Sequence, residues 1–217
     1  MRSERGTALI SVLCCLAGAA TAVAQAKPLT DSAAMARASA DSIRFPYTAA
    51  DIRFMSGMVG HHAQAIAMSE WAPTHGAGPS VRVLAARIIN AQQDEIVSVQ
   101  RWLADRRQPV PPADPKGLTM QMGGMPHTML MPGMLTEAEM AQLDAARGPE
   151  FDRRFLVFMI RHHKGAITMV NELLGSYGAG QDQAVFKFAS DVNIDQTTEI
   201  ERMERMLAAL INSPDQG

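Results

Sequence analysis

The sequence predicts an all-α protein in which two repeated helical hairpins form a four-helix bundle. Helix-forming residues dominate the 217-residue chain, and no stretch alternates between apolar and polar residues for long. One segment recurs later in the chain, and prolines and glycines interrupt each copy where two helices and a loop require breaks. Two hairpins with apolar helix faces bury those faces most simply against each other.

The repeat is the strongest of these signals. Residues 51–68 read DIRFMSGMVGHHAQAIAM and residues 152–169 read DRRFLVFMIRHHKGAITM, and nine of the 18 aligned positions are identical. Chance would give about one identity over this length, so the segment is duplicated. The similarity continues into a second helix of each copy after a three-residue insertion in the connecting segment. The sequence therefore predicts the same helix–loop–helix unit twice.

Breaking residues set the expected limits of the helices. In the first copy we expect a helix over about residues 51–71, ended by Pro73. A second helix is expected over about residues 80–106, before the proline-rich segment 109–115.

The second copy has comparable punctuation. Pro149 suits the first turn of a helix that reaches about residue 174, glycines occupy the following loop, and the last helix ends near residue 212. Between the copies, Thr136 and Glu139 have the spacing of a capping box, which predicts one short helix.

The first 26 residues are expected to be a signal peptide, because two arginines precede a short apolar stretch that ends in small residues. Both cysteines, Cys14 and Cys15, lie inside it. Cleavage would leave a periplasmic or secreted protein with no thiolate ligand and no stable membrane anchor. Residues 27–45 are expected to be flexible, and residues 46–212 to form one domain. Its parts are repeat one 46–108, a methionine-rich linker with a short helix 109–148, and repeat two 149–212.

The charge balance argues against one broad class of function. The chain has 20 basic and 22 acidic residues, for a net charge of −2. Proteins that bind nucleic acid need a clear basic excess, so we expect no nucleic-acid partner. The sequence identifies no protein partner.

A helical projection places both histidine pairs on apolar helix faces, beside two methionines in each repeat. The second helix of each repeat presents one glutamate on its own apolar face. Because carboxylates are rarely buried alone, we expect all four histidines to point inward, within reach of these glutamates. The candidate metal ligands are His61, His62, His162, His163, Met58, Met68, Met159 and Met169, with Glu95 and Glu199 behind them as carboxylates that orient the imidazoles.

Two interpretations of this cluster remain open. A histidine–glutamate hydrogen-bond network would satisfy the buried polar groups by itself, and methionines at helical spacing commonly fill cores. A duplicated pair of adjacent histidines is, however, a costly way to fill a core. Imidazole and thioether donors together suit Cu(I) or Ag(I), whereas hard ions prefer oxygen and structural zinc prefers thiolate. We therefore expect copper, as Cu(I), to be the bound cofactor.

The linker carries a second group of soft donors, since residues 120–134 read MQMGGMPHTMLMPGM. Methionine at this density specifies a core poorly, so we interpret the segment as a weaker metal-collecting loop or as a cover over the open end of the bundle. His75, in a loop with proline and glycine, is expected to be solvated. The weaker candidate ligands are Met120, Met122, Met125, His127, Met129, Met131 and Met134.

Two stretches, FMSGMVGHHAQAIAM and MPGMLTEAEMAQLDAARGPEFDRRFLVFMIRHHKGAITM, closely resemble the bacterial family known as domain of unknown function 305. The resemblance covers about residues 46–210. It implies a ferritin-like four-helix bundle and, from some members, an exported copper-binding protein linked to copper tolerance. It also implies the four histidines and four helical methionines above as ligands. One position departs from the family pattern, because the methionine expected in the second helix of a hairpin is Met203 in repeat two but Val99 in repeat one.

Three functions compete at this point. The first is copper binding, in buffering or tolerance, without enzymatic activity. The second is a structural or interaction module whose histidines and glutamates form only a hydrogen-bond network. The third is a ferritin-like di-metal redox protein, which is disfavoured because the Glu-x-x-His spacing of that class is absent. No nucleophile triad, Walker loop or dinucleotide fingerprint is present.

Overall fold

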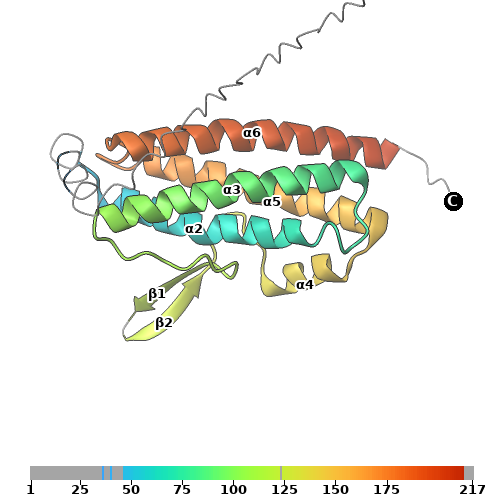
Figure 1. Ribbon diagram of the computed structural model, residues 1–217, viewed down its shortest axis with the longest axis horizontal. Coiled ribbons are helices and arrows are strands. Elements are labelled where there is room, and N and C mark those ends of the chain that lie inside the picture. The colour runs from blue at the N-terminus through green and yellow to red at the C-terminus, as the bar shows by residue number, and fades with distance from the viewer. Residues whose placement is uncertain (1–35, 37–39, 41–45, 123, 213–217) are drawn as a thin grey trace, which may run out of the picture.

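Four long helices form the bundle that the repeat predicts (Figure 1). The computed structural model describes residues 36, 40, 46–122 and 124–212, so the predicted signal peptide and most of segment 27–45 lie outside the described residues. The helix limits agree with the predicted ones to within two residues, and the fold class is confirmed. The helices are α2 (Ala49–Glu70), α3 (Pro79–Asp105), the short α4 (Glu137–Ala145), α5 (Gly148–Leu174) and α6 (Gln183–Asn212).

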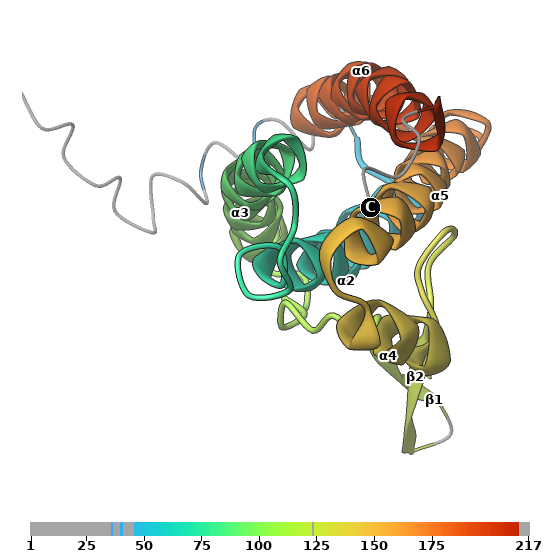
Figure 2. The same cartoon turned by 90° about the vertical axis from the view of Figure 1, so that its right-hand side faces the viewer.

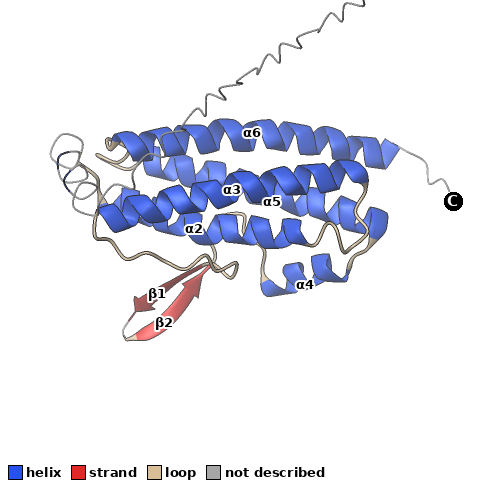
Figure 3. Ribbon diagram, viewed as in Figure 1, coloured by secondary structure: helices blue, strands red, loops and turns tan. Residues whose placement is uncertain are grey.

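The linker contains a small β-hairpin that the sequence analysis did not predict (Figure 3). Strands β1 (Leu118–Met122) and β2 (Met125–Met129) pair antiparallel, and Gly124 adopts a φ of +81° in the turn. Glycine is favoured there because a side chain strains this left-handed conformation. The alternation of methionine with polar residues is a strand signal too short to stand out beside the helical repeats. The hairpin projects from the bundle on the side where α4 also lies (Figure 2).

Side-chain caps fix the start of two helices. Thr136 and Glu139 form the predicted capping box at α4, in which the Thr136 hydroxyl accepts from the Glu139 backbone and the Glu139 carboxylate accepts from the Thr136 backbone. Thr48 and Asp51 form a second capping box at the start of α2. Each box satisfies backbone N–H groups that the helix leaves without partners, and a cap of this kind contributes about 1 kcal/mol.

Two aspartates at equivalent positions of the repeats tie the hairpins to each other. Asp51, at the start of α2, accepts a hydrogen bond of 2.7 Å from the backbone N of Gly180, in the loop between α5 and α6. Asp152, at the start of α5, accepts one of 3.0 Å from the backbone N of Gly78, in the loop between α2 and α3. Each hairpin therefore holds the loop of the other, which sets α2 and α5 antiparallel.

Two apolar clusters fill the bundle, one toward each end. One contains Leu84, Phe151 and Phe155, and the other contains Phe54 and Trp102. Full burial of a large apolar side chain contributes about 1.5–3 kcal/mol relative to exposure, so these clusters dominate the stabilisation of the helices. No helix within the described ranges is both long and apolar enough to cross a bilayer.

The end of the linker, residues 131–135, forms a strap that crosses α2 and α5 on the side away from α3 and α6 (Figure 2). The strap lies close to the helix backbones because glycines face it. A β-carbon at Gly165 of α5 would lie 1.9 Å from the carbonyl oxygen of Pro132, and one at Gly57 of α2 would lie 2.9 Å from the sulfur of Met131. Only a residue without a side chain permits the first of these approaches.

A buried amide holds the strap in place. The Gln64 side chain accepts a hydrogen bond of 2.6 Å from the backbone N of Leu135 and donates to the Leu135 carbonyl oxygen at 3.0 Å. It also donates to the carbonyl oxygen of Pro115, which precedes the hairpin, at 3.0 Å. One side chain of α2 therefore anchors both ends of the linker segment that contains the hairpin.

We predict that Gly165→Ala destabilises the protein by about 1–3 kcal/mol, because the new methyl group forces the strap away from α5. Chemical denaturation followed by circular dichroism measures the change. Gly57→Ala is the matched control, since its methyl group meets only the flexible side chains of Met131 and Met169 and alanine favours the helix by about 0.5–1 kcal/mol. Equal stabilities of the two variants would contradict the close approach of strap and α5.

Candidate metal centre

The four histidines of the repeats are buried where α2 and α5 cross. His61, His62, His162 and His163 are each at most 1% exposed, which confirms the predicted inward direction. The rings of His61 and His162 lie against each other, with 3.8 Å between centroids and 37° between planes. The two neighbouring pairs, His61–His62 and His162–His163, have centroid separations of 6.1 Å and 6.3 Å. The two repeats therefore contribute equally to one cluster of imidazoles.

Glu95 and Glu199 each contact one histidine of this cluster. Nε2 of His62 lies 2.8 Å from a carboxylate oxygen of Glu95, without hydrogen-bond geometry. Nε2 of His163 donates to a carboxylate oxygen of Glu199 at 2.7 Å. The predicted glutamate contacts are thus found for His62 and His163. At His61 a backbone group takes this place, since Nε2 donates to the carbonyl oxygen of Pro132 at 3.1 Å.

Five of the eight ring nitrogens in the cluster have no hydrogen-bond or ion-pair partner among the described residues: Nδ1 of all four histidines and Nε2 of His162. A buried polar atom without a partner costs about 1–3 kcal/mol. Because carbonyl and carboxylate oxygens accept hydrogen bonds, Nε2 of His61 and of His163 carries a proton, and in the neutral ring of His61 Nδ1 keeps its lone pair. Metal-binding histidines commonly show this arrangement, in which one nitrogen donates to an oxygen and the other binds the ion.

Burial keeps the two central rings neutral. It lowers the pKa of His61 to about 3, and the neighbouring His62 adds to the effect. Burial also lowers the pKa of His162 well below its usual value of 6.5, again with smaller contributions from His61 and His163. Neutral imidazole is the form that binds metals, so neither ring has to lose a proton at neutral pH to act as a ligand.

The four helical methionines lie in the apolar clusters on both sides of the histidines. Met68 and Met159 belong to one cluster, and Met58 and Met169 belong to the other. All four are buried. Because α2 and α5 run antiparallel, the methionine before the histidines in one repeat shares a cluster with the methionine after the histidines in the other. Thioethers therefore flank the imidazoles along both helices.

One position departs from the family pattern: it is Val99 in α3 and Met203 in α6. Both side chains are buried in the apolar clusters. At this position, therefore, only repeat two contributes a thioether to its cluster.

The structure divides the linker candidates into two groups. Met131 and Met134 belong to the strap, where Met134 is buried and its sulfur lies 3.3 Å from the backbone N of Met131. They are thus part of the bundle surface and do not belong to a separate metal-collecting loop. Met125, His127 and Met129 are exposed on β2. Met120 and Met122 lie in β1, and their side chains are outside the described part of the structure.

His75 is buried, so the prediction that it is solvated was wrong. Its ring stacks on Trp71 and contacts Phe151, which come from different segments of the chain. Nε2 lies 2.9 Å from a carboxylate oxygen of Asp144, in α4. The proline and glycine around His75 did not reveal these distant aromatic neighbours. His75 therefore joins the α2–α3 loop to α4 and is not part of the histidine cluster.

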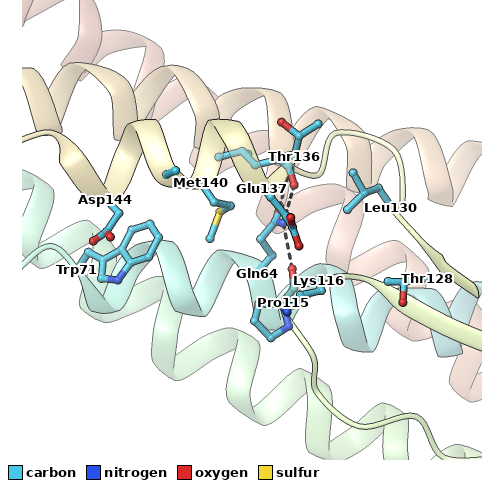
Figure 4. Close-up of a pocket in the computed structure, with 12 residues that line it drawn as sticks. Gln64, Trp71, Pro115, Lys116, Thr128, Leu130, Thr136, Glu137, Met140 and Asp144 are labelled. Carbon is cyan, nitrogen blue, oxygen red and sulfur yellow. Dashed lines mark hydrogen bonds between the residues drawn. The ribbon is translucent and has the colours of Figure 1, made fainter.

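A groove of about 740 Å³ opens beside the centre, between α2, α4 and the strap (Figure 4). Trp71, Met140 and Leu130 line it, and the anchoring Gln64 lies at its base. None of the four clustered histidines reaches this groove. The described residues also contain no group of three or more histidine, cysteine, aspartate or glutamate side chains arranged to hold a metal.

Two residues, Pro132 and Gln64, place the strap against the histidines, and neither was predicted from the sequence. A signal was nevertheless present, because the repeats differ where the strap packs. Gln64 corresponds to Gly165, and Gly57 corresponds to Phe158. Since the linker occurs once, its contacts must break the match between the repeats.

Comparison with known proteins assigns the chain to a family. Residues 51–207 match the family model described as domain of unknown function (DUF305). The chain belongs to the DUF305 family. Over 57 residues it is also 37% identical to an uncharacterised protein of Acanthamoeba polyphaga mimivirus, and this match spans 26% of the chain and 38% of the viral protein.

Solved structures of DUF305 proteins share the bundle. A DUF305 protein from Streptomyces coelicolor is 28% identical with a TM-score of 0.62, over 77% of this chain and 98% of that one. A DUF305 fragment from Deinococcus radiodurans is 27% identical with a TM-score of 0.62, over 75% and 98% of the two chains. CopM in its Cu(I)-bound form is 26% identical with a TM-score of 0.56, over 73% and 96%.

We predict that the protein loses stability as the pH falls from about 6.5 toward 3, in part because of His61 and His162. Above this window both rings are neutral in the folded and unfolded states. Within it the unfolded chain binds protons that the buried rings do not, so each ring removes up to about 1.4 kcal/mol per pH unit.

Denaturation curves between pH 7 and 4.5 test this prediction. The free energy of unfolding of the double variant His61→Leu/His162→Leu should fall less steeply with decreasing pH than that of the wild type. The difference in slope should correspond to up to about two bound protons. Identical slopes would mean that the central rings are protonated in the folded protein.

Proposed function

We propose that this DUF305 protein binds Cu(I) outside the cytoplasm, in a centre formed by the histidines of both repeats, and that it buffers copper without catalysing a reaction. The observation that carries the proposal is the set of five buried imidazole nitrogens without a hydrogen-bond or ion-pair partner among the described residues, which are Nδ1 of all four histidines and Nε2 of His162. A pure hydrogen-bond network would have paired them, because unpaired buried polar groups are costly. A metal ion supplies the missing partner.

The donor set supports a soft ion. Nδ1 of His61 has a free lone pair while Nε2 donates to an oxygen, Nδ1 of His163 has no hydrogen-bond partner, and both ring nitrogens of His162 are free of hydrogen bonds among the described residues. The methionines of the two flanking clusters offer thioethers, and no cysteine follows Cys15. Imidazole and thioether together favour Cu(I) over hard ions, which require more oxygen donors.

Similar proteins support both the metal and the location. Structures of CopM, 26–28% identical to this chain, have been determined in Cu(I)-, Cu(II)- and Ag-bound forms. The Streptomyces coelicolor relative is described as a candidate secreted protein. Export also agrees with the expected signal peptide at residues 1–26 and with a mature chain free of cysteine.

We predict that His61→Leu/His162→Leu lowers Cu(I) affinity by about 100-fold or more, equivalent to about 2.7 kcal/mol. Leucine fills most of the space of each ring and leaves only the carbonyl oxygen of Pro132 without its partner, so the bundle should remain folded. Anaerobic titration against a chromophoric Cu(I) chelator measures the affinity, and circular dichroism verifies the fold. A folded variant with wild-type affinity would refute the histidine centre.

We predict that the β-hairpin formed by β1 and β2 contributes only weaker Cu(I) sites. Exposed methionines must be ordered on binding, at a cost of up to about 2 kcal/mol for each side chain. Changing Met120, Met122, Met125 and Met129 to leucine and His127 to alanine should therefore leave the tightest class of Cu(I) binding intact and reduce only the total stoichiometry. Loss of the tight class in this variant, with the histidine variant unaffected, would place the main site in the hairpin.

A further inference from the structure

We propose that Met131 and Met169 form a thioether port through which a soft monovalent ion reaches the buried histidines. The proposal rests on the proposed function of the histidine centre. It gives Met131, which is partly exposed, a kinetic role, because Met131 accepts the ion at the surface and passes it inward to Met169, which is also a candidate ligand of the centre.

The two methionines come from distant parts of the chain and meet at one glycine. The sulfur of Met131, in the strap, lies 2.9 Å from the position of a β-carbon on Gly57, and the methyl carbon of Met169, in α5, lies 3.2 Å from the same point. Gly57 therefore makes room for both thioethers on the surface of α2. Its equivalent in the other repeat is Phe158, so the second repeat lacks this space.

These thioethers line a cavity of about 350 Å³ that is open to solvent. Phe54 and Leu173 provide apolar walls, and Arg53 and Glu172 also line the cavity with charges of opposite sign. The cavity therefore has no net charge among its lining residues that would repel a monovalent cation. Thioethers without nearby competing thiolate favour Cu(I) and Ag(I) over hard ions.

The inner wall of the cavity contacts the histidine cluster directly. Pro132 lines the cavity, and its carbonyl oxygen accepts the hydrogen bond from Nε2 of His61 at 3.1 Å. One residue thus separates the thioethers from the first buried imidazole. Met131 is the neighbour of Pro132 in the chain, so a small movement of the strap at this point would connect the cavity with the cluster.

The approach from the opposite side of the bundle has a different chemistry. Glu95 of α3 and Glu199 of α6 are partly exposed and contact His62 and His163. Burial raises the pKa of the nearby Asp195 carboxyl, and the negative charges of Glu95 and Glu199 add to the effect. This face offers oxygen donors, which a soft ion binds poorly. The port is therefore the side of the centre that matches Cu(I).

The test compares rates with affinities. Apo protein is mixed anaerobically with Cu(I) bound to a chromophoric chelator, at concentrations where the rate is proportional to protein. The variant Met131→Leu removes the outer sulfur, keeps the apolar volume and leaves Met169, a candidate ligand of the centre, in place. Met206→Leu is the matched control, because Met206 packs against the other apolar cluster, on α6. Dissociation rates come from the reverse experiment with excess chelator, and circular dichroism verifies the fold of each variant.

We expect the port variant to bind Cu(I) about tenfold more slowly or slower still. Dissociation should slow by the same factor, because the ion leaves by the route it enters, so the equilibrium affinity is unchanged. The control should match the wild type. Unchanged association, or a dissociation rate that stays constant or rises, would overturn the port. Failure of the wild-type protein to bind Cu(I) at all would instead refute the histidine centre, and the port with it.

Discussion

The close contact between His61 and His162 is the constraint on which the rest of the structure depends. Two imidazoles with centroids 3.8 Å apart can share a dry interior only when both are neutral, since two positive charges at that distance would repel strongly in a medium of low dielectric constant. Exclusion of water from both rings keeps them neutral even below their ordinary pKa of 6.5, because burial lowers the pKa of each ring. The apolar clusters at each end, the antiparallel crossing of α2 and α5, and the strap together provide that exclusion.

The strap is the least regular part of this enclosure, and the helices are adapted to it. Each glycine inside a helix lowers its stability by about 1 kcal/mol relative to alanine, yet α2 has Gly57 and Gly60 and α5 has Gly165. The strap backbone lies against Gly165 and brings a carbonyl oxygen to His61, and the Met131 side chain lies against Gly57. Gly60 is approached by the backbone of Gly117, at the start of the β-hairpin. Helix propensity has thus been given up where the linker must approach the histidines. The same approach leaves Met131 at the surface beside Met169.

Local sequence signals were sufficient to predict the helices and the inward histidines, because breaks, caps and apolar faces depend on neighbours within a few residues. Thr136 with Glu139 and the four buried histidines are examples. The contact of His61 with His162 could not be predicted in this way, because it depends on how one hairpin crosses the other. Likewise, the rings that bury His75 come from Trp71 in its own loop and from Phe151, at the start of α5. The strap, finally, was visible only as the positions where the repeats fail to match.

The reciprocal contacts of Asp51 and Asp152 give the bundle the symmetry of an isologous dimer, in which each half uses the same surface and residues on the axis meet their own equivalents. His61 and His162 are such a pair. The strap lies across this twofold axis and is not itself symmetric, because the carbonyl oxygen of Pro132 accepts a hydrogen bond from only one of the two rings. The linker therefore turns two equivalent histidines into unlike ones: His61 has a fixed tautomer, whereas His162 is free to present either nitrogen. Duplication supplied a symmetric scaffold, and the connection between its halves made the centre asymmetric.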